Sequence, residues 1–321
     1  MSQELSVKEK AMKGKNLVSM GDFSREEVER VIERAQALKA EWKAGGNPPL
    51  LAGKTMAMIF EKPSLRTRVT FEAGMTQLGG HAIYLGRDIG FGTRETIADI
   101  AANLSRWVEI IVARTYAHES VVELAQEAIV PVINALSDHE HPCQALAALL
   151  TLYEHKGNNE RVRGLKLAWL GDGNNVCHSL LLICATMGIN MTAACPRGYW
   201  PDPGVVGWAR KLAQESGSEI VVTTDPAAAA KEADALYTDV WASMGQESEA
   251  EERSKIFPPY QVNQPLVDLA KEDVLIMHCL PAHRGEEITA EVLDGPHSVV
   301  LDEAENRLHV QKALMVEMLG F

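Results

Sequence analysis

Cysteine is scarce in this chain of 321 residues, and the few cysteines show no pairing pattern. The five are Cys143, Cys177, Cys184, Cys195 and Cys279, an odd number without a Cys-x-x-Cys pair. Disulfide frameworks and structural zinc sites both rest on ordered cysteine spacings. The sequence therefore predicts reduced thiols in a cytoplasmic protein, with no bound metal.

Long apolar runs and excess positive charge are also missing. No run approaches the roughly 18 apolar residues of a membrane-spanning helix, and residues 1–20 lack the apolar core of a secretory signal. The 31 lysines and arginines stand against 44 acidic residues, a formal net charge of −13. A surface of that sign repels nucleic acid and anionic membranes, so we expect neither as a partner.

The length and the pattern of apolar runs predict two α/β domains. A chain of 321 residues exceeds what one hydrophobic core usually serves. Short apolar runs alternate with helical patterns through both halves, which is typical of parallel sheets with helices on both faces. We expect two doubly wound parallel-sheet domains of similar size, joined by interdomain helices. The predicted strands are 55–60, 81–85, 110–114, 130–135, 165–170, 190–195, 219–224, 235–240, 274–279 and 298–302.

The boundary between the two domains is expected near residue 140. The first domain takes residues 1–140, and the second takes residues 141–303. A closing helix at 304–321 packs back on the first domain. The polar stretch EHKGNNERVRG (154–164) and the helical pattern before it mark the junction.

Polar and reactive residues follow the predicted strands, and ligands of parallel sheets bind at those carboxyl ends. The segment SLRTR (64–68) comes after the strand at 55–60 and opens a predicted helix. Its backbone N–H groups, two hydroxyls and two guanidiniums favour an anion with several oxygens, such as phosphate. Arg114, at the end of another strand, strengthens that interpretation. The alternative is a helix cap whose arginines form surface salt bridges.

The segment HEHPCQ offers three potential metal ligands, His139, His141 and Cys143. Their spacing is not one that zinc sites use. The favoured interpretation makes His141 a hydrogen-bond donor to a polarised carbonyl, with Gln144 near it on the same helix face. A histidine that stands at a helix start without any role is the alternative.

The segment GDGNNVCHSLL follows a strand and opens a helix, as a dinucleotide-binding fingerprint does. However, the third glycine position holds Val176, and the next strand ends in Cys195 instead of an acid. NAD binding is therefore disfavoured, and no cofactor is expected. Asn174 and Asn175 instead offer amide donors and acceptors to a polar substrate.

Two further strand ends carry reactive side chains. Asp239 can bind a substrate ammonium group or cap a helix, and Ser243 and Met244 follow it in a predicted turn. Cys279, unlike the other cysteines, is singled out by its place at a strand end. There it can hold a thiolate beside arginine or histidine cations.

With these segments assembled, the chain resembles the aspartate/ornithine carbamoyltransferase family. The resemblance spans nearly the whole chain, and the motifs fit members that act on ornithine. The motifs that carry it are FEKPSLRTRVTFEAGMTQLGGHAIYL, SDHEHPCQALA, GDGNNVCHSLL, DVWASMGQE, MHCLPAHRGEEIT and EAENR. Several specific motifs in this order leave little room for chance.

The resemblance implies an enzyme that transfers the carbamoyl group of carbamoyl phosphate to the δ-amine of L-ornithine. The products are L-citrulline and phosphate, within arginine metabolism. Residues 1–140 would bind carbamoyl phosphate, and residues 141–303 would bind ornithine. Members of the family form catalytic trimers with active sites at subunit boundaries, which implies a homotrimer or a multiple of trimers.

The resemblance also implies roles for single residues. The carbamoyl phosphate ligands would be Ser64, Leu65, Arg66, Thr67, Arg68, Arg114, His141, Gln144, Cys279, Leu280 and Arg307. The ornithine ligands would be Asn175, Asp239, Ser243 and Met244. The catalytic residues would be Arg68, His141, Cys279 and Arg307.

Two positions depart from the family pattern, and three alternatives stay open. The helix after HPCQ usually reads ALADL in the family, whereas here Ala148 replaces the acid. The loop that a neighbouring subunit lends to carbamoyl phosphate commonly carries Gln or His, whereas here that position holds Gly90, and Thr93 or Arg94 would substitute. The alternatives are another acceptor (putrescine, N-acetylornithine or aspartate), a nicotinamide dehydrogenase, and a paralogue that binds carbamoyl phosphate without activity. Aspartate is disfavoured because its second carboxylate needs cationic partners, whereas this chain offers Asp239 and Cys279.

Overall fold

Two separate parallel sheets organise the chain, each in its own unit. The first unit holds the chain up to Leu150 together with Asn306–Phe321, and the second unit is Thr151–Glu305. The chain passes between the units within two helices, α6 (Pro142–Lys156) and α14 (Val300–Leu319). The residues described by this computed structural model are 12–157, 159–243, 245 and 247–321.

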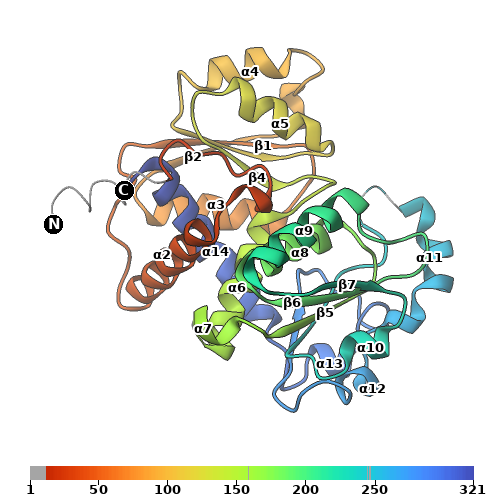
Figure 1. Cartoon of the computed structure of the whole chain (residues 1–321). Helices are drawn as coiled ribbons and strands as arrows, with labels where there is room; N and C mark the ends of the chain where they lie inside the picture. The colour runs from red at the N-terminus through yellow and green to blue at the C-terminus, as the bar shows by residue number, and fades with distance from the viewer. Residues whose placement is uncertain (1–11, 158, 244, 246) are drawn as a thin grey trace. The chain divides into compact units, whose positions relative to one another are not determined.

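The sheet of the first unit has four strands in the order β2-β1-β3-β4. The strands are β1 (Thr55–Phe60), β2 (His81–Leu85), β3 (Ile110–Arg114) and β4 (Val132–Leu136). The helices are η1 (Met20–Asp22), α2 (Arg25–Lys43), α3 (Leu65–Gln77), η2 (Arg87–Ile89), α4 (Ile97–Leu104) and α5 (His118–Glu127). Figure 1 shows α4 and α5 on one face of this sheet and α3 on the other. Strands β3 and β4 are buried along their whole length, as parallel strands covered on both faces should be.

The sheet of the second unit has five strands in the order β7-β6-β5-β8-β9. The strands are β5 (Lys166–Leu170), β6 (Asn190–Ala194), β7 (Ile220–Thr223), β8 (Ala235–Thr238) and β9 (Leu275–His278). The helices are α7 (Asn159–Val162), α8 (Asn175–Met187), α9 (Pro203–Ser216), α10 (Pro226–Ala230), η3 (Glu247–Glu249), α11 (Ala250–Ile256), η4 (Pro258–Tyr260), α12 (Gln264–Val267) and α13 (Ala290–Leu293). Helices α8 and α9 cover one face, and α10, α12 and α13 cover the other (Figure 1).

Each unit has its own apolar core against its sheet. In the first unit, Ile111 of β3 and Leu124 of α5 belong to one buried cluster. In the second unit, Leu236 of β8 packs in a cluster with Leu266 of α12 and Val292 of α13. The strand ends therefore project from rigid platforms. In the described part of the chain, no helix is long and apolar enough to cross a membrane.

Side-chain caps turn the chain from strand to helix at two of these strand ends. Ser64 Oγ accepts the N–H of Thr67 at the start of α3, shortly after β1. Asn174 Oδ1 accepts the N–H groups of Val176 and Cys177 at the start of α8, shortly after β5. Serine and asparagine are favoured at this position because they satisfy N–H groups that the helix leaves without a carbonyl partner.

Both strand orders contain a point where the winding reverses. The chain runs outward from β1 to β2 and then crosses back to β3, and it runs from β5 through β6 to β7 before crossing back to β8. Ligands of doubly wound sheets bind outside the strand ends at such points. The segments located there are SLRTR after β1, Arg114 at the end of β3, GDGNN after β5, and Asp239 after β8.

The predicted α/β class with two parallel sheets is confirmed, and nine of the predicted strands exist with ends within two residues of the expected ones. The strand predicted at 298–302 is wrong. Ser298 forms a single bridge with Ile276, the N–H of Val299 donates to the Ile276 carbonyl, and α14 then begins at Val300. A short apolar run such as SVVLD suits a buried strand and a buried helix start equally well, so the pattern could not decide.

Candidate active site

The first turn of α3 is the centre of a cationic cluster in the first unit. Two arginines from distant segments converge there on Thr67. Arg307 Nη2 donates to Thr67 Oγ1 at 3.0 Å, and Arg114 Nη1 donates to the same oxygen at 3.5 Å. Arg307 Nη1 donates to Gln144 Oε1 at 2.6 Å. All four side chains are buried, so the fold brings guanidiniums, a hydroxyl and the positive end of a helix dipole to one place.

His141 belongs to the same cluster and is buried. Burial lowers the pKa of His141 well below its usual range, and the positive charges of Arg307, Arg114 and Arg66 lower it further. The ring is therefore neutral at pH 7. A neutral imidazole can donate a hydrogen bond without adding another positive charge beside the guanidiniums.

Arg68 makes contacts of a different kind. Its Nε donates to Glu72 Oε1 at 2.9 Å, and its guanidinium carbon lies 3.7 Å from the ring centroid of Tyr84. The side chain is exposed. The sequence predicted that Arg66 and Arg68 act on one anion, but the described contacts of Arg68 lead to Glu72 and Tyr84. Leu65, between the other predicted ligands, has an exposed side chain.

Sequence reasoning missed Lys62, which stands between β1 and α3. Its side chain is buried, and its Nζ lies 4.6 Å from the ring centroid of Tyr116. Burial lowers the pKa of Lys62, Asp138 opposes that shift, and Arg114 adds to it. Because Arg114 of the cluster acts electrostatically on Lys62, the Lys62 ammonium group is a further positive charge near that cluster. Its place within FEKPS, directly after a strand, was the available signal.

Gly90 follows η2, and its backbone conformation explains why a glycine occupies this position of the loop. Its φ is +67°, and a Cβ there would lie 2.6 Å from the Cβ of Arg94. A glycine is the residue that accepts this left-handed turn without strain. Arg87, three residues earlier, donates to the carbonyl of Glu61 and to the hydroxyl of Tyr116 within its own unit.

Asp239, at the end of β8, is the focus of a polar network in the second unit. Cys279 Sγ and the N–H of Val240 both donate to Asp239 Oδ1 at 2.8 Å, and Asn174 Nδ2 donates to Oδ2 at 2.8 Å. The carboxylate is buried. With three donors directed at it, Asp239 is held in one orientation as an acceptor.

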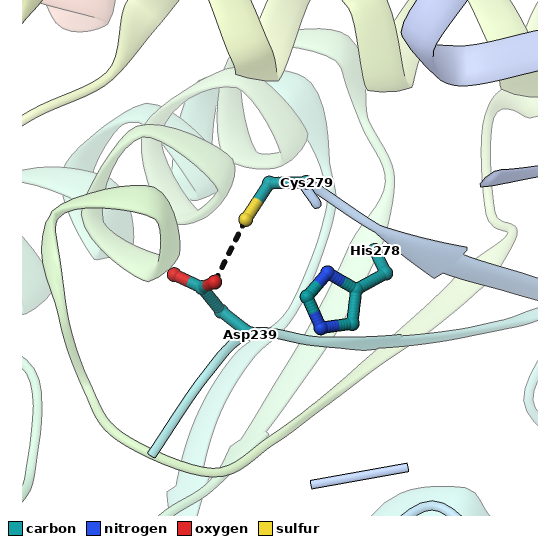
Figure 2. A group of neighbouring side chains, drawn as sticks. All are labelled: Asp239, His278 and Cys279. Carbon is teal, nitrogen blue, oxygen red and sulfur yellow. Dashed lines mark hydrogen bonds between the residues drawn. The ribbon is translucent and has the colours of Figure 1, made fainter. Parts of the chain in front are cut away.

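The Cys279 thiol has a carboxylate as its hydrogen-bond partner. Figure 2 shows the sulfur directed at Asp239, with the His278 ring beside the pair. The sequence suggested a thiolate held by nearby cations. In this geometry the S–H donates to the carboxylate of Asp239.

The remaining predicted ornithine ligands lie near Asp239 in the chain or in the fold. Asn175 opens α8, and Ser243 follows β8 by a few residues. Met244 lies outside the described residues. Asn174, which we expected to face the substrate, instead caps α8 and holds Asp239.

A buried pair supports the backbone beside Cys279. His278 Nε2 lies 3.0 Å from Glu287 Oε1, and His278 Nδ1 accepts the N–H of Leu280 at 2.8 Å. Leu280 adopts a left-handed conformation with φ +55°. A non-glycine residue in that region persists only where its surroundings hold it, and the His278 bond provides such a restraint.

Among the described residues, two groups of side chains have the spacing of metal ligands. Atoms of Asp239, His278 and Cys279 lie within 4.8 Å of one another. Both nitrogens of His278 are engaged, and Cys279 donates to Asp239. Cys143, from the alternative metal interpretation, donates to the Asn134 carbonyl, and burial raises its pKa to about 12. The second group is His283, Glu286 and Glu287.

Both halves of the chain match sequence models of one family. Residues 15–154 match the carbamoyl-P binding domain of aspartate/ornithine carbamoyltransferase, and residues 163–318 match its Asp/Orn binding domain. The chain belongs to the aspartate/ornithine carbamoyltransferase family. The family predicted from the motifs is thereby confirmed.

Relatives in this carbamoyltransferase family match over nearly their full length. The ornithine carbamoyltransferase of Anoxybacillus flavithermus is 54% identical over 309 residues, which are 96% of this chain and 98% of the relative. A protein of Pyrococcus furiosus named "Ornithine carbamoyltransferase, anabolic" is 52% identical over 311 residues, covering 97% and 98%.

Solved structures agree with the sequence relatives. The ornithine carbamoyltransferase structure from Pyrococcus furiosus matches with a TM-score of 0.93 at 52% identity, covering 96% of this chain and 98% of that one. The structure from Thermus thermophilus matches with a TM-score of 0.84 at 46% identity, covering 95% and 98%. The two-domain carbamoyltransferase fold is therefore shown by sequence and structure together.

Proposed function

We propose that this carbamoyltransferase transfers the carbamoyl group of carbamoyl phosphate to the δ-amine of L-ornithine, giving L-citrulline and phosphate. The first unit, with the C-terminal part of α14, forms the carbamoyl phosphate domain, and the second unit forms the ornithine domain. The observation that carries the proposal is the convergence of Arg114 and Arg307 on Thr67 at a helix start. Such a buried cluster suits a dianionic phosphate ester with a carbonyl group.

The cationic cluster acts at two stages of a direct nucleophilic attack. As the amine attacks the carbamoyl carbon, negative charge grows on the carbonyl oxygen, where Thr67, Arg307 and His141 stabilise it. The bond from carbon to the phosphate oxygen then breaks, and the charge moves to the departing phosphate. The other ligands of carbamoyl phosphate are Ser64, Leu65, Arg66, Arg114, Gln144, Cys279 and Leu280. Arg68 has a minor part, because its guanidinium is held by Glu72 and Tyr84.

The second domain prepares the amine. Asn175, Asp239, Ser243 and Met244 bind ornithine, and Asp239 with Cys279 favours the neutral amine that attack requires. The proton released from the nitrogen leaves toward the Asp239 carboxylate, which is the acceptor of this network. The attack is direct, without a covalent enzyme intermediate. Holding both substrates in place removes much of the entropic barrier to this attack.

The charge at Asp239 favours ornithine over other acceptors. The second carboxylate of aspartate would meet a buried carboxylate and be repelled. N-acetylornithine lacks the α-ammonium group, and putrescine lacks the α-carboxylate. A site built to hydrogen-bond a polar group rejects an analogue that lacks it, because its own buried groups lose their partner.

Citrulline formation from ornithine and carbamoyl phosphate tests the proposal directly. We expect kcat/KM for ornithine to exceed that for putrescine, N-acetylornithine and aspartate by about 100-fold or more. Titration with carbamoyl phosphate alone belongs to the same experiment. Binding without product from any acceptor would support a non-catalytic paralogue and overturn the proposal.

The proposal extends to assembly and location. We expect a cytoplasmic homotrimer, or a multiple of trimers, that needs no cofactor and serves arginine biosynthesis. All five cysteines are free thiols and four of them are buried, which suits a reducing compartment. Sedimentation should give a mass of three chains of 35.1 kDa, or a multiple of that. A fully active monomer would contradict this part of the proposal.

A further inference from the structure

Arg253 of α11 lies in a buried polar network outside the predicted ornithine ligands. Its side chain is 5% exposed. Arg253 Nη1 donates to Asp172 Oδ2 at 2.9 Å and to the carbonyl oxygen of Trp241 at 2.7 Å. One guanidinium nitrogen therefore joins two segments that are distant in sequence.

Those two segments are the ones that support Asp239. Asp172 stands two residues before Asn174, whose amide donates to Asp239 Oδ2 at 2.8 Å. Trp241 stands two residues after Asp239 and two before Ser243. Arg253 therefore binds two segments that flank Asp239: the one that contains Asn174 and the one that follows Asp239 in the chain. Asp239 is the carboxylate that we assign to ornithine.

The surroundings keep this guanidinium in one orientation. Its central carbon lies 4.7 Å from the ring centroid of Tyr199 and 5.7 Å from that of Phe257. The Tyr199 carbonyl accepts the N–H of Gly173 at 2.8 Å, and the Asp172 carbonyl accepts Trp169 Nε1 at 2.9 Å. The backbone around Asp172 is thus fixed from two further sides.

A purely stabilising ion pair is the simpler explanation for these contacts. Burying two charges costs desolvation, however, and a buried pair often stabilises a fold no better than apolar side chains would. Orientation is the property that such a pair supplies and an apolar contact does not. Arg253 Nη1 forms a fork, because it also donates to the backbone carbonyl of Trp241. This second hydrogen bond fixes the orientation of the guanidinium, which a purely stabilising ion pair would not need.

We infer that Arg253 is a positioning residue for the ornithine site, acting through Asp172 and the Trp241 carbonyl on Asp239 and Ser243. The inference rests on the proposed function, since it takes Asp239 and Ser243 as ornithine ligands. It predicts that Arg253 affects ornithine recognition and leaves carbamoyl phosphate recognition alone.

The test is a comparison of KM for both substrates in Arg253→Gln and in Glu249→Gln. Glu249 accepts from Arg253 Nε at 2.9 Å but is half-exposed, so it is the matched control on the solvent side of the same guanidinium. We expect Arg253→Gln to raise KM for ornithine about 10- to 100-fold, since charge-assisted buried hydrogen bonds are lost. KM for carbamoyl phosphate should stay within about twofold, and Glu249→Gln should change either KM by less than about twofold.

Two further variants keep the test decisive if Arg253→Gln does not fold. Arg253→Lys keeps the charge but not the fork, and should raise KM for ornithine less than the glutamine variant. Asp172→Asn should raise it in the same direction, and the double variant should cost less than the sum of both. A lower melting temperature with an unchanged KM for ornithine would show a structural role only and overturn the inference.

Direct titration with ornithine separates this inference from the proposed function. A wild-type protein that makes no citrulline would contradict the proposed function, yet its affinity for ornithine would still be measurable. Weaker ornithine binding by Arg253→Gln, relative to Glu249→Gln, supports the inference in either case. Equal ornithine affinity in wild type, Arg253→Gln and Asp172→Asn overturns it.

Discussion

The two units carry opposite chemistry on the same kind of platform. Each is a parallel sheet whose polar residues gather where the winding reverses, between β1 and β3 in one unit and between β5 and β8 in the other. The first unit surrounds Thr67 with guanidiniums, whereas the second surrounds Asp239 with hydrogen-bond donors. The comparison teaches that the sheet supplies rigid positions and that side chains at the strand ends select the charge of the ligand.

The groups that orient the charges are neutral in both units. Arg307 donates to the hydroxyl of Thr67 and the amide of Gln144. Asp239 accepts from the thiol of Cys279 and the amide of Asn174. A neutral partner fixes the direction of a charged group without cancelling its charge, which is then available to an oppositely charged substrate.

The largest expected loss of activity comes from the cationic cluster of the first unit. Arg66→Ala should lower kcat/KM for carbamoyl phosphate by about 10²–10³-fold, because it removes a charge from the transition state. Steady-state kinetics measures the loss, and circular dichroism checks the fold. Arg106→Ala, an exposed arginine that donates to the Ala102 carbonyl in the same unit, is the control and should stay near wild type. Equal losses in both variants would mean that net charge, not the cluster, matters.

On the acidic side, Asp239→Asn should raise KM for ornithine about 10- to 100-fold while KM for carbamoyl phosphate changes little. The amide keeps the shape but loses the charge that attracts an ammonium group. Asp225→Asn is the control, since Asp225 caps α10 through the N–H of Ala228. A rise in KM for both substrates would erase the distinction between the two units.

The stability of the second unit should depend on Asp172 in a defined direction of pH. Burial raises the pKa of Asp172 to about 6, Arg253 opposes the shift, and Asp239 and Glu249 add to it. The folded state then binds the proton more tightly than the unfolded chain, so this carboxyl contributes less stability as pH rises from about 4 through 6.

Asp172→Asn should remove that pH dependence. The free energy of unfolding of the variant, minus that of wild type, should be larger at pH 8 than at pH 5, by on the order of 1–3 kcal/mol. Urea denaturation of both proteins at the two pH values measures the difference. The same difference at both values would show that the Asp172 carboxyl is ionised throughout.

The smallest effect is expected for Arg68. Because its guanidinium contacts Glu72 and Tyr84 at an exposed position, Arg68→Ala should cost at most about fivefold in kcat/KM, in the range of an exposed ion pair. Arg66→Ala is measured beside it. A loss with Arg68→Ala as large as that with Arg66→Ala would show that Arg68 leaves Tyr84 to reach the phosphate.

Much of the fold was predictable because its signals are local. The apolar runs of β1 and β3 and the serine before α3 are properties of neighbouring residues. The motifs at the strand ends were predictable for the same reason, since a doubly wound sheet gathers whatever follows its strands. The strand prediction at 298–302 failed because only Val299 and Val300 of this run are buried, whereas Leu301 is exposed on the first turn of α14.

Other features could not be read from the chain. The local sequence pattern does not distinguish Asn174 from Asn175, although only Asn174 is seen to donate a hydrogen bond to Asp239 among the described contacts. Arg253 stands in the acidic segment EAEERSK and has the pattern of a surface ion pair. Its bond to Asp172 joins residues 81 positions apart, and no sequence signal predicted it.

The sequence by itself determined the α/β class, the order of the two domains, the family and the set of reactive residues at the strand ends. These depend on apolar periodicity, helix caps and motif order, which act over a few neighbouring residues. Only the tertiary structure decided that Arg307 reaches Thr67 across 240 positions, that Arg68 packs on Tyr84, and that the Cys279 thiol donates to Asp239. Such contacts depend on how distant segments pack, and packing is a property of the folded whole.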